Sequence, residues 1–264
     1  MRSSRMVLAG VMVAVLVGAG ACARPGTNVG PAAAVSDAPS PSPSPVDPVA
    51  ELADAISKTR VTTLTFTIDS GRPGVGKLHG VGASDPANRR QTLTMTITAD
   101  GKTTHEQVIT IGTDLYLKSD EPSPGVSRKK WMHIDTAKAG GLSADQFGGL
   151  TDPSGLESYA KAATTVHRTG PRQYEGTLDF TKMAPAMAAG SIPSTIGDAV
   201  KAVPFTATTD EQGRLTSMVI KMPSMGEGMP ATTGTVRFAD FGAPVKIQAP
   251  PKSQIVEASK DSFS

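Results

Sequence analysis

The sequence predicts an α+β fold, mainly antiparallel β, in which a strongly curved sheet has helices lying across its concave face. Three observations lead to this prediction. Apolar and polar residues alternate with period two in several segments, which is typical of half-buried antiparallel strands. Helical patterns occur before the first strands and again between the earlier and later strands. A sheet of so many strands must curl, and its apolar face needs a cover, which the helices can supply.

The first residues have the pattern of an export signal. Arg2 and Arg5 precede an apolar run from Met6 to Gly20, which is shorter than the ~20 residues that a membrane span requires. The run ends in small residues directly before Cys22, the only cysteine of the chain. This segment resembles the lipobox of bacterial lipoproteins, in which the cysteine thiol is the lipid attachment site. The alternative is an ordinary cleavable signal, which predicts a secreted protein without an anchor.

The chain is expected to divide into residues 1–21 as signal peptide, 22–46 as lipidated cysteine and tether, and 47–264 as one domain. Residues 23–46 are rich in Pro, Ser, Ala and Gly, a composition that cannot build a core and predicts an extended, disordered tether. Without Arg2 and Arg5, the remaining basic and acidic side chains are equal in number. This balance argues against a nucleic-acid partner, which would favour a basic excess.

The domain opens with a helix. Asp47 is the predicted N-cap and Pro48 the first helical residue, and Glu51 lies near the positive end of the helix dipole. The amphipathic pattern ends near Lys58-Thr59-Arg60.

Strands follow in an antiparallel meander. Asp100-Gly101 is the strongest hairpin signal between two of them. The Gly-rich segment Lys77 to Ala83 is weaker than the others and fits an edge or a strongly bent position. The strands expected in this half are Val61 to Ile68, Lys77 to Ala83, Gln91 to Thr98, Thr103 to Ile111, Leu115 to Lys118 and Lys130 to Asp135.

The second half begins with a helical section. Asp152-Pro153 caps a helix from Ser154 to Ala163, and Thr181 to Val200 is expected to form two short helices broken by Gly190 and Pro193. The strands expected here are Tyr174 to Phe180, Val203 to Thr209, Arg214 to Met222 and Thr232 to Asp240.

Taken together, these segments resemble the LolA-like lipid-carrier superfamily, and within it the actinobacterial lipoproteins of the LppX and LprG group. The resemblance implies an incomplete β-barrel that closes over helices around an apolar cavity for acyl chains. It rests on the lipobox-like end at Cys22, the Pro-Ser tether, the helix from Pro48 with Val61 to Ile68, Ile111 to Lys118, Trp131 to Asp135, Tyr174 to Lys182, Val203 to Thr206, Gly213-Arg214-Leu215, Phe241 to Val245 and Ala249-Pro250-Pro251.

The candidate cavity residues lie on the apolar faces of the expected strands and covering helices. The alternative is that they form a solid core, because packed cores and acyl cavities use the same side chains. The candidates are Leu64, Phe66, Ile68, Leu93, Met95, Ile97, Met183, Met187, Ile192, Ile196, Phe205, Met218, Ile220 and Met222.

Three motifs of catalytic or ligand-binding sites are incomplete or absent in this sequence. Residues 71–77 match the start of a phosphate-binding loop, but Leu78 stands where Ser or Thr must bind magnesium, so a Gly-rich hairpin is expected. His105-Glu106 lacks the second histidine of a zinc-protease motif, because Ile109 occupies that position. No Gly-x-Ser-x-Gly sequence occurs. We therefore expect no metal, no cofactor and no enzymatic activity.

The function expected from the sequence is that of an envelope lipoprotein, anchored at the outer face of the cytoplasmic membrane, that carries or presents an acylated lipid or lipoglycan. Hydrophobic burial would supply the binding energy, and no placed polar group is required. Two alternatives remain open: a non-catalytic interaction module on the same scaffold, with protein partners unspecified, and a hydrolase that uses carboxylates near strand ends.

Overall fold

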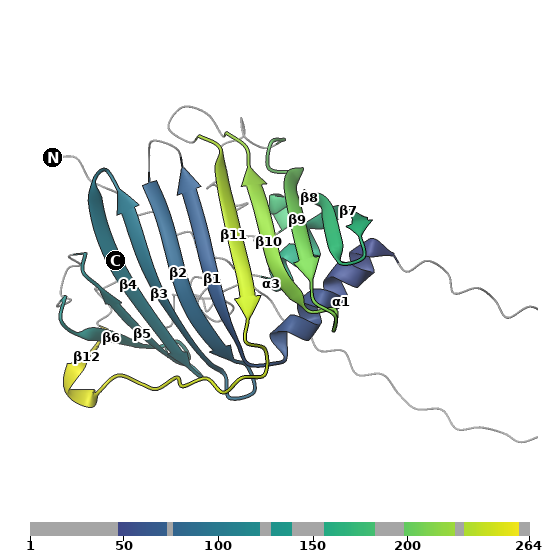
Figure 1. The fold of residues 1–264 in the computed structure, drawn as a ribbon. Helices are drawn as coiled ribbons and strands as arrows, with labels where there is room; N and C mark the ends of the chain where they lie inside the picture. Colours follow the sequence, from purple (N-terminus) through teal and green to yellow (C-terminus); the bar gives the residue numbers. More distant parts are fainter. Residues whose placement is uncertain are drawn as a thin grey trace, which may run out of the picture.

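A computed structural model describes residues 47–72, 76–121, 128–138, 156–182, 198–224 and 230–258. In these ranges the chain forms one sheet of twelve strands in the order β12-β6-β5-β4-β3-β2-β1-β11-β10-β9-β8-β7 (Figure 1). The strands are β1 Leu64–Arg72, β2 Gly76–Asp85, β3 Arg90–Ala99, β4 Lys102–Ile111, β5 Asp114–Ser119, β6 Trp131–Asp135, β7 Ala163–Gly170, β8 Gln173–Leu178, β9 Val203–Thr209, β10 Leu215–Met222, β11 Thr232–Ala239 and β12 Ile255–Glu257.

The predicted fold class is wrong in two respects. The sheet does not close into a barrel, because its edge strands β12 and β7 do not pair with each other, and β12 runs parallel to β6, which makes the sheet mixed. The two α-helices of the described ranges, α1 Pro48–Arg60 and α3 Leu156–Ala162, do not cover a concave face. Instead α1 packs against β7, β10 and α3 at one end of the sheet (Figure 1). None of the helices described here is long and apolar enough to span a membrane.

The first helix is as predicted. Pro48 begins α1, and the Asp47 side chain accepts a hydrogen bond of 3.1 Å from the backbone N–H of Val49. One face of the helix buries Leu52, Ala55, Ile56 and Thr59. The 13 residues of α1 make a helix roughly 20 Å long. Because neighbouring strands lie about 4.8 Å apart, the helix can dock on one end of the sheet but cannot extend across all twelve strands.

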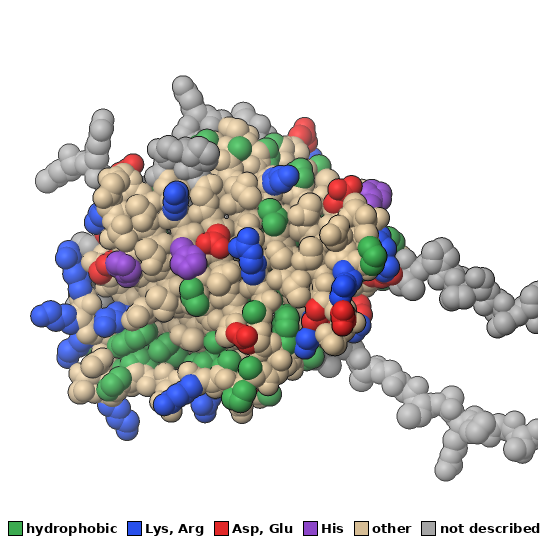
Figure 2. Space-filling view, in the orientation of Figure 1, with side chains coloured by type: hydrophobic (Ala, Val, Ile, Leu, Met, Phe, Trp, Pro, Cys, Tyr) green, Lys and Arg blue, Asp and Glu red, His purple; other side chains and the backbone are tan. Residues whose placement is uncertain are grey.

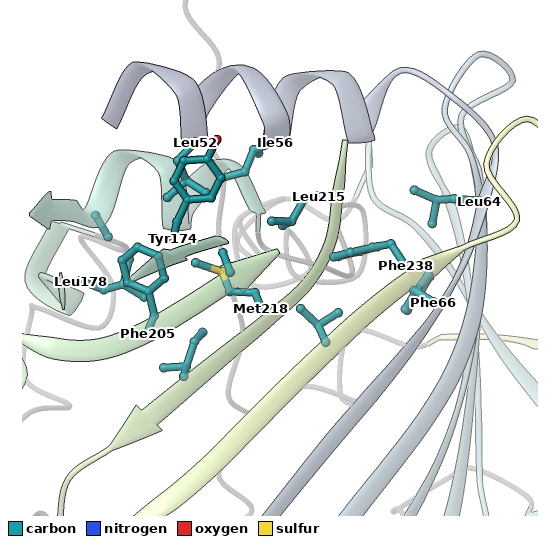
Figure 3. Packing of buried hydrophobic residues seen from close by; sticks show 14 of the residues in the cluster. Leu52, Ile56, Leu64, Phe66, Tyr174, Leu178, Phe205, Leu215, Met218 and Phe238 are labelled. Carbon is teal, nitrogen blue, oxygen red and sulfur yellow. The ribbon is translucent and has the colours of Figure 1, made fainter. Parts of the chain in front are cut away.

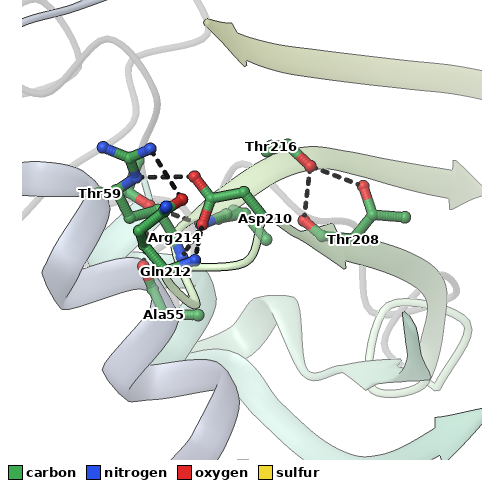
Figure 4. A network of polar contacts seen from close by, with 8 residues as sticks. Ala55, Thr59, Thr208, Asp210, Gln212, Arg214 and Thr216 are labelled. Carbon is green, nitrogen blue, oxygen red and sulfur yellow. Dashed lines mark hydrogen bonds and ion pairs between the residues drawn. The ribbon is translucent and has the colours of Figure 1, made fainter. Parts of the chain in front are cut away.

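Thr59 joins α1 to the sheet through hydrogen bonds. Its buried hydroxyl donates to the carbonyl of Ala55 at 2.8 Å and accepts from the backbone N–H of Leu215, also at 2.8 Å. Leu215 lies at a register shift between β10 and β9, where the ladder leaves this N–H available. Beside it, Asp210 accepts from the backbone N–H and the guanidinium of Arg214 (Figure 4). This network fixes the angle at which α1 meets β10.

A single apolar cluster lies between α1 and the sheet and continues along one sheet face. Figure 3 shows Leu52 and Ile56 of α1 lying above Tyr174, Leu178 and Met218 of the sheet. From there the cluster continues through Phe66 and Phe238 to Leu93, Val108, Leu115 and Ile134. We call the side of the sheet that carries these residues the apolar face.

Glycine has a structural role in β2. The Gly-rich segment, which was expected at an edge or a strongly bent position, is an interior strand between β1 and β3, so the edge alternative is wrong. Gly82 pairs with Phe66 and Leu93, and a Cβ at Gly82 would meet the Phe66 ring. The glycine therefore lets the neighbouring aromatic side chain lie across the strand. The hairpin predicted for residues 71–77 is confirmed, since Arg72 pairs with Gly76.

Candidate functional site

The candidate site is the less buried half of the apolar face. Of the predicted cavity residues, six are buried in the core cluster: Leu64, Phe66, Leu93, Phe205, Met218 and Ile220. Ile68, Met95 and Met222 are partly buried and pack against that cluster, and Ile97 is half-buried opposite Leu78. Cys22, Met183, Met187, Ile192 and Ile196 lie outside the described residues.

The half-buried side chains share a position in the sheet. Successive cross-strand pairs place Ile68 beside Gly80 and Met95, and place Leu78 beside Ile97 one row further from α1. A ligand that approaches this face meets these side chains first. They are aliphatic or thioether groups, which adapt to a flexible apolar ligand.

A notch opens in the same row as Leu78 and Ile97. Gly234 of β11 lies between Ile220 of β10 and Ser70 of β1, so two small residues adjoin here. Among the described residues, a Cβ built at Gly234 would meet no atom within 4 Å, in contrast to Gly80, where it would meet Leu93, Ile68 and Met95. As far as these residues show, space is open above Gly234, with Ile220 on one side and Leu78 beyond Ser70 on the other.

One ionisable side chain lies in the middle of the apolar face. Glu106 of β4 pairs with Met95 and Ser119, and it is half-buried. Burial raises the pKa of Glu106, and the nearby charges of Asp120 and Glu121 raise this pKa further. A protonated Glu106 could donate a hydrogen bond to an oxygen of a bound head group.

The sequence contains a signal for Glu106 that motif reasoning misses. A motif search treats His105-Glu106 only as a fragment of a zinc site, whereas in β4 the inward positions are Thr104, Glu106, Val108 and Thr110. A carboxylate in an inward position is expensive unless it is protonated or binds something. The described residues contain no group of three or more His, Cys, Asp or Glu side chains that could hold a metal ion.

The opposite face of the sheet is polar. Thr65, Thr67, Thr94 and Thr96 point to it, and so do His79, His105 and His133. His133 is the most enclosed of these histidines: Nε2 lies 2.9 Å from Asp114 Oδ1, Nδ1 lies 2.7 Å from Glu257 Oε2, and the ring stacks on Tyr116. Through Glu257 this cluster attaches β12 to β6.

Protonation of His133 is expected to stabilise that attachment. Burial lowers the pKa of His133, but hydrogen bonds and charges from Asp114 and Glu257 outweigh it and raise the pKa above its ordinary value of 6.5. A raised folded-state pKa contributes stability that is fully present below the unfolded pKa and is lost as pH rises through the folded one. In His133→Gln, we expect the free energy of unfolding to fall less between neutral and mildly alkaline pH than in the wild type.

Urea unfolding at a series of pH values measures this difference. His79→Gln is the matched control, because it removes a histidine that makes an exposed pair with Asp69 on the same face. A His133→Gln profile with the full wild-type slope would contradict the role given to His133.

Comparison with known proteins gives structural similarity only. No family model matches the sequence, and no curated protein sequence does. A protein from Thermus thermophilus is similar in structure at 9% identity and a TM-score of 0.38, covering 79% of this chain and 98% of that one. A LolA superfamily protein from Nitrosomonas europaea is similar at 12% identity and a TM-score of 0.28, covering 79% and 97%. A porin-like protein from Bacteroides uniformis is similar at 12% identity and 0.26, covering 69% and 98%.

A LolA superfamily protein is therefore among the structures that this chain resembles, and the narrower LppX and LprG type stays a prediction. With TM-scores below 0.5, these similarities carry no functional argument. Function therefore has to be inferred from the residues of the chain itself.

Proposed function

We propose that the chain is a non-enzymatic lipid-binding protein that holds acyl chains against the apolar face of its sheet. The observation that carries the proposal is the notch at Gly234, which lies between the buried Ile220 and the half-buried Leu78 on a part of the face that α1 and α3 leave free. The ligand class is acylated lipid or lipoglycan, and the role is to carry or present it in the cell envelope. The predicted anchor at Cys22 and the Pro-Ser tether would place the domain close to a membrane.

Hydrophobic burial is sufficient for such binding. An acyl chain that buries roughly 200 Å² of apolar surface gains about 5 kcal/mol at ~25 cal/mol per Å². Ile68 and Met95 supply apolar surface in one row and Ile97 in the next, and Glu106 places a carboxyl group beside Met95. This arrangement fits a ligand with a long apolar tail and an oxygen-bearing head.

Filling the notch tests the proposal. The Cβ of a phenylalanine at position 234 would meet no atom of the described residues within 4 Å, and its ring would occupy the notch. We therefore expect Gly234→Phe to fold normally and to bind a fluorescent fatty acid at least tenfold more weakly than the wild type. The measurement is a fluorescence titration of the purified full chain with this fatty acid.

Gly71→Phe is the matched control. Gly71 lies on the neighbouring strand β1, pairs with Thr233 next to Gly234, and faces the polar side. A Cβ added at Gly71 would also meet no atom within 4 Å. The affinity of this variant for the probe should equal that of the wild type. Equal affinities in the two variants would exclude the notch as the acyl site, and a wild-type protein that binds no probe would refute the proposed function.

A further inference from the structure

A second surface with a distinct chemistry lies at the opposite edge of the sheet from α1, on the polar face. Lys118 is on β5, residues 128–130 lead directly into β6, and Lys252 begins the short 3-10 helix Lys252–Gln254 that leads into β12. Because β6 and β12 are parallel and Ile255 pairs with Trp131, the starts of both strands lie at the same end. We call Lys118, Arg128, Lys129, Lys130 and Lys252 the basic edge.

The acidic side chains near the basic edge already have partners. Asp120 accepts hydrogen bonds from the backbone N–H of His105 at 2.8 Å and lies 2.9 Å from its ring Nδ1. Glu121 accepts from Lys102 and from the hydroxyl of Thr104. The five cations of the basic edge outnumber these two carboxylates, although the charge of the whole chain is nearly balanced. Figure 2 shows Lys and Arg side chains gathered along this edge of the visible face.

A small cavity lies within the basic edge. It has a volume of about 170 Å³ and is lined by His105, Gln107, Lys118, Ser119, Asp120 and Arg128. Lys118 and Arg128 bring two cations to it, Asp120 brings a carboxylate, and Gln107 brings a neutral hydrogen-bond donor. Arginine and lysine beside neutral donors are the groups that bind phosphate oxygens in proteins.

Apolar and aromatic side chains adjoin the basic edge on the same face. Lys118 Nζ lies 5.8 Å from the centre of the Trp131 ring, and Ile255 pairs with Trp131 on the next strand. Ile109 and Ile111 of β4 are half-buried nearby, and Figure 2 shows a hydrophobic area at the lower left with Lys and Arg side chains beside and beneath it. Trp131 is itself buried, so the accessible apolar groups here are aliphatic. Aliphatic groups rimmed by Lys and Arg are typical of surfaces that lie at a membrane interface. A soluble polyanion would need the charges but not the apolar area.

We propose that the basic edge docks the domain onto an anionic phospholipid surface, with a head-group phosphate in the cavity between Lys118 and Arg128. An anionic membrane attracts each Lys or Arg that lies near its surface. The loss of two such charges is expected to weaken the affinity for the membrane about 30-fold. The proposal does not depend on acyl binding at the notch, because it uses the other face of the sheet.

Vesicle co-sedimentation tests the docking. The full chain carries Cys22→Ala in every sample, so that no lipid anchor contributes. Wild-type protein should bind vesicles that contain phosphatidylglycerol and not vesicles of phosphatidylcholine alone, and added salt should weaken the binding. Lys118→Gln with Arg128→Gln should bind the anionic vesicles about 30-fold more weakly. If that double variant does not fold, Arg128→Gln with Lys130→Gln replaces it, because both side chains are exposed.

The matched control is Lys58→Gln with Lys201→Gln, which removes the same charge from exposed lysines elsewhere in the chain. It should bind vesicles nearly as well as the wild type. An equal loss in both double variants would overturn the proposal, since net charge alone would then explain the binding. Binding to a soluble anionic polysaccharide without binding to anionic vesicles would also overturn it.

Discussion

Gly82→Ala is expected to destabilise the protein by about 3 kcal/mol, at the upper end of the usual range for overpacking. The added methyl group would overlap the Phe66 ring and would lie 2.6 Å from the carbonyl oxygen of Thr92. The aromatic ring is fully packed and the carbonyl belongs to the neighbouring strand, so neither can move without shifting β2 against β1 and β3. Chemical unfolding followed by circular dichroism measures the change.

Two further variants make this prediction specific to the close approach of Phe66. Gly71→Ala is the control on β1, where a Cβ meets nothing within 4 Å, and it should change stability by less than about 0.5 kcal/mol. Phe66→Leu combined with Gly82→Ala should cost less than the sum of the two single changes, because the smaller side chain makes room for the methyl group. Strictly additive costs would show that the ring does not lie over Gly82.

Leu52→Ala is expected to cost about 3 kcal/mol, within the range of roughly 2–5 kcal/mol found for buried leucines. Leu52 has no exposed surface and belongs to the cluster that joins α1 to the sheet. Asp54→Ala on the exposed side of the same helix removes only a surface ion pair with Lys58 and should cost less than about 0.5 kcal/mol. Equal effects of the two changes in urea unfolding would contradict the packing of α1 on the sheet.

Local features were predictable because they depend on neighbours in sequence. The Asp47 cap, the extent of α1 and the alternation in β3 were all predicted, and the Asp100-Gly101 turn has the positive φ values of 51° and 74° that this dipeptide favours. Two strands were missed. β7 has Val166 as its one fully buried apolar residue in an otherwise polar segment, and the three residues of β12 are strand only because β6 lies beside them.

The order of the sheet depends on contacts far apart in sequence. β1 pairs with β11, so the first and last thirds of the chain meet in the centre of the sheet, and no local pattern indicates this. The predicted helical cover failed for a related reason. The buried face of α1 shows that the helix packs on something, but only the tertiary structure shows that it lies at one end.

The sequence predicts which side chains share the face of the candidate site, but not how deeply each of them is buried. Alternation assigned Leu93, Met95 and Ile97 to one face correctly, but their burial decreases along β3, and this decrease separates core from accessible surface. The notch could not be predicted, because Gly234 appears in the sequence as one more strand glycine. Only the strand pairing, which places Gly234 between Ile220 and Ser70, shows that it forms the notch.

The most direct test of lipid binding is native mass spectrometry of the full chain purified from a lipid-containing host, compared with its Gly234→Phe variant. We expect wild-type protein to carry discrete additional masses that fragment to acyl chains, and the variant to carry much less of them. Wild-type protein that is free of lipid in every preparation, and that takes up no added fatty acid, would contradict the account.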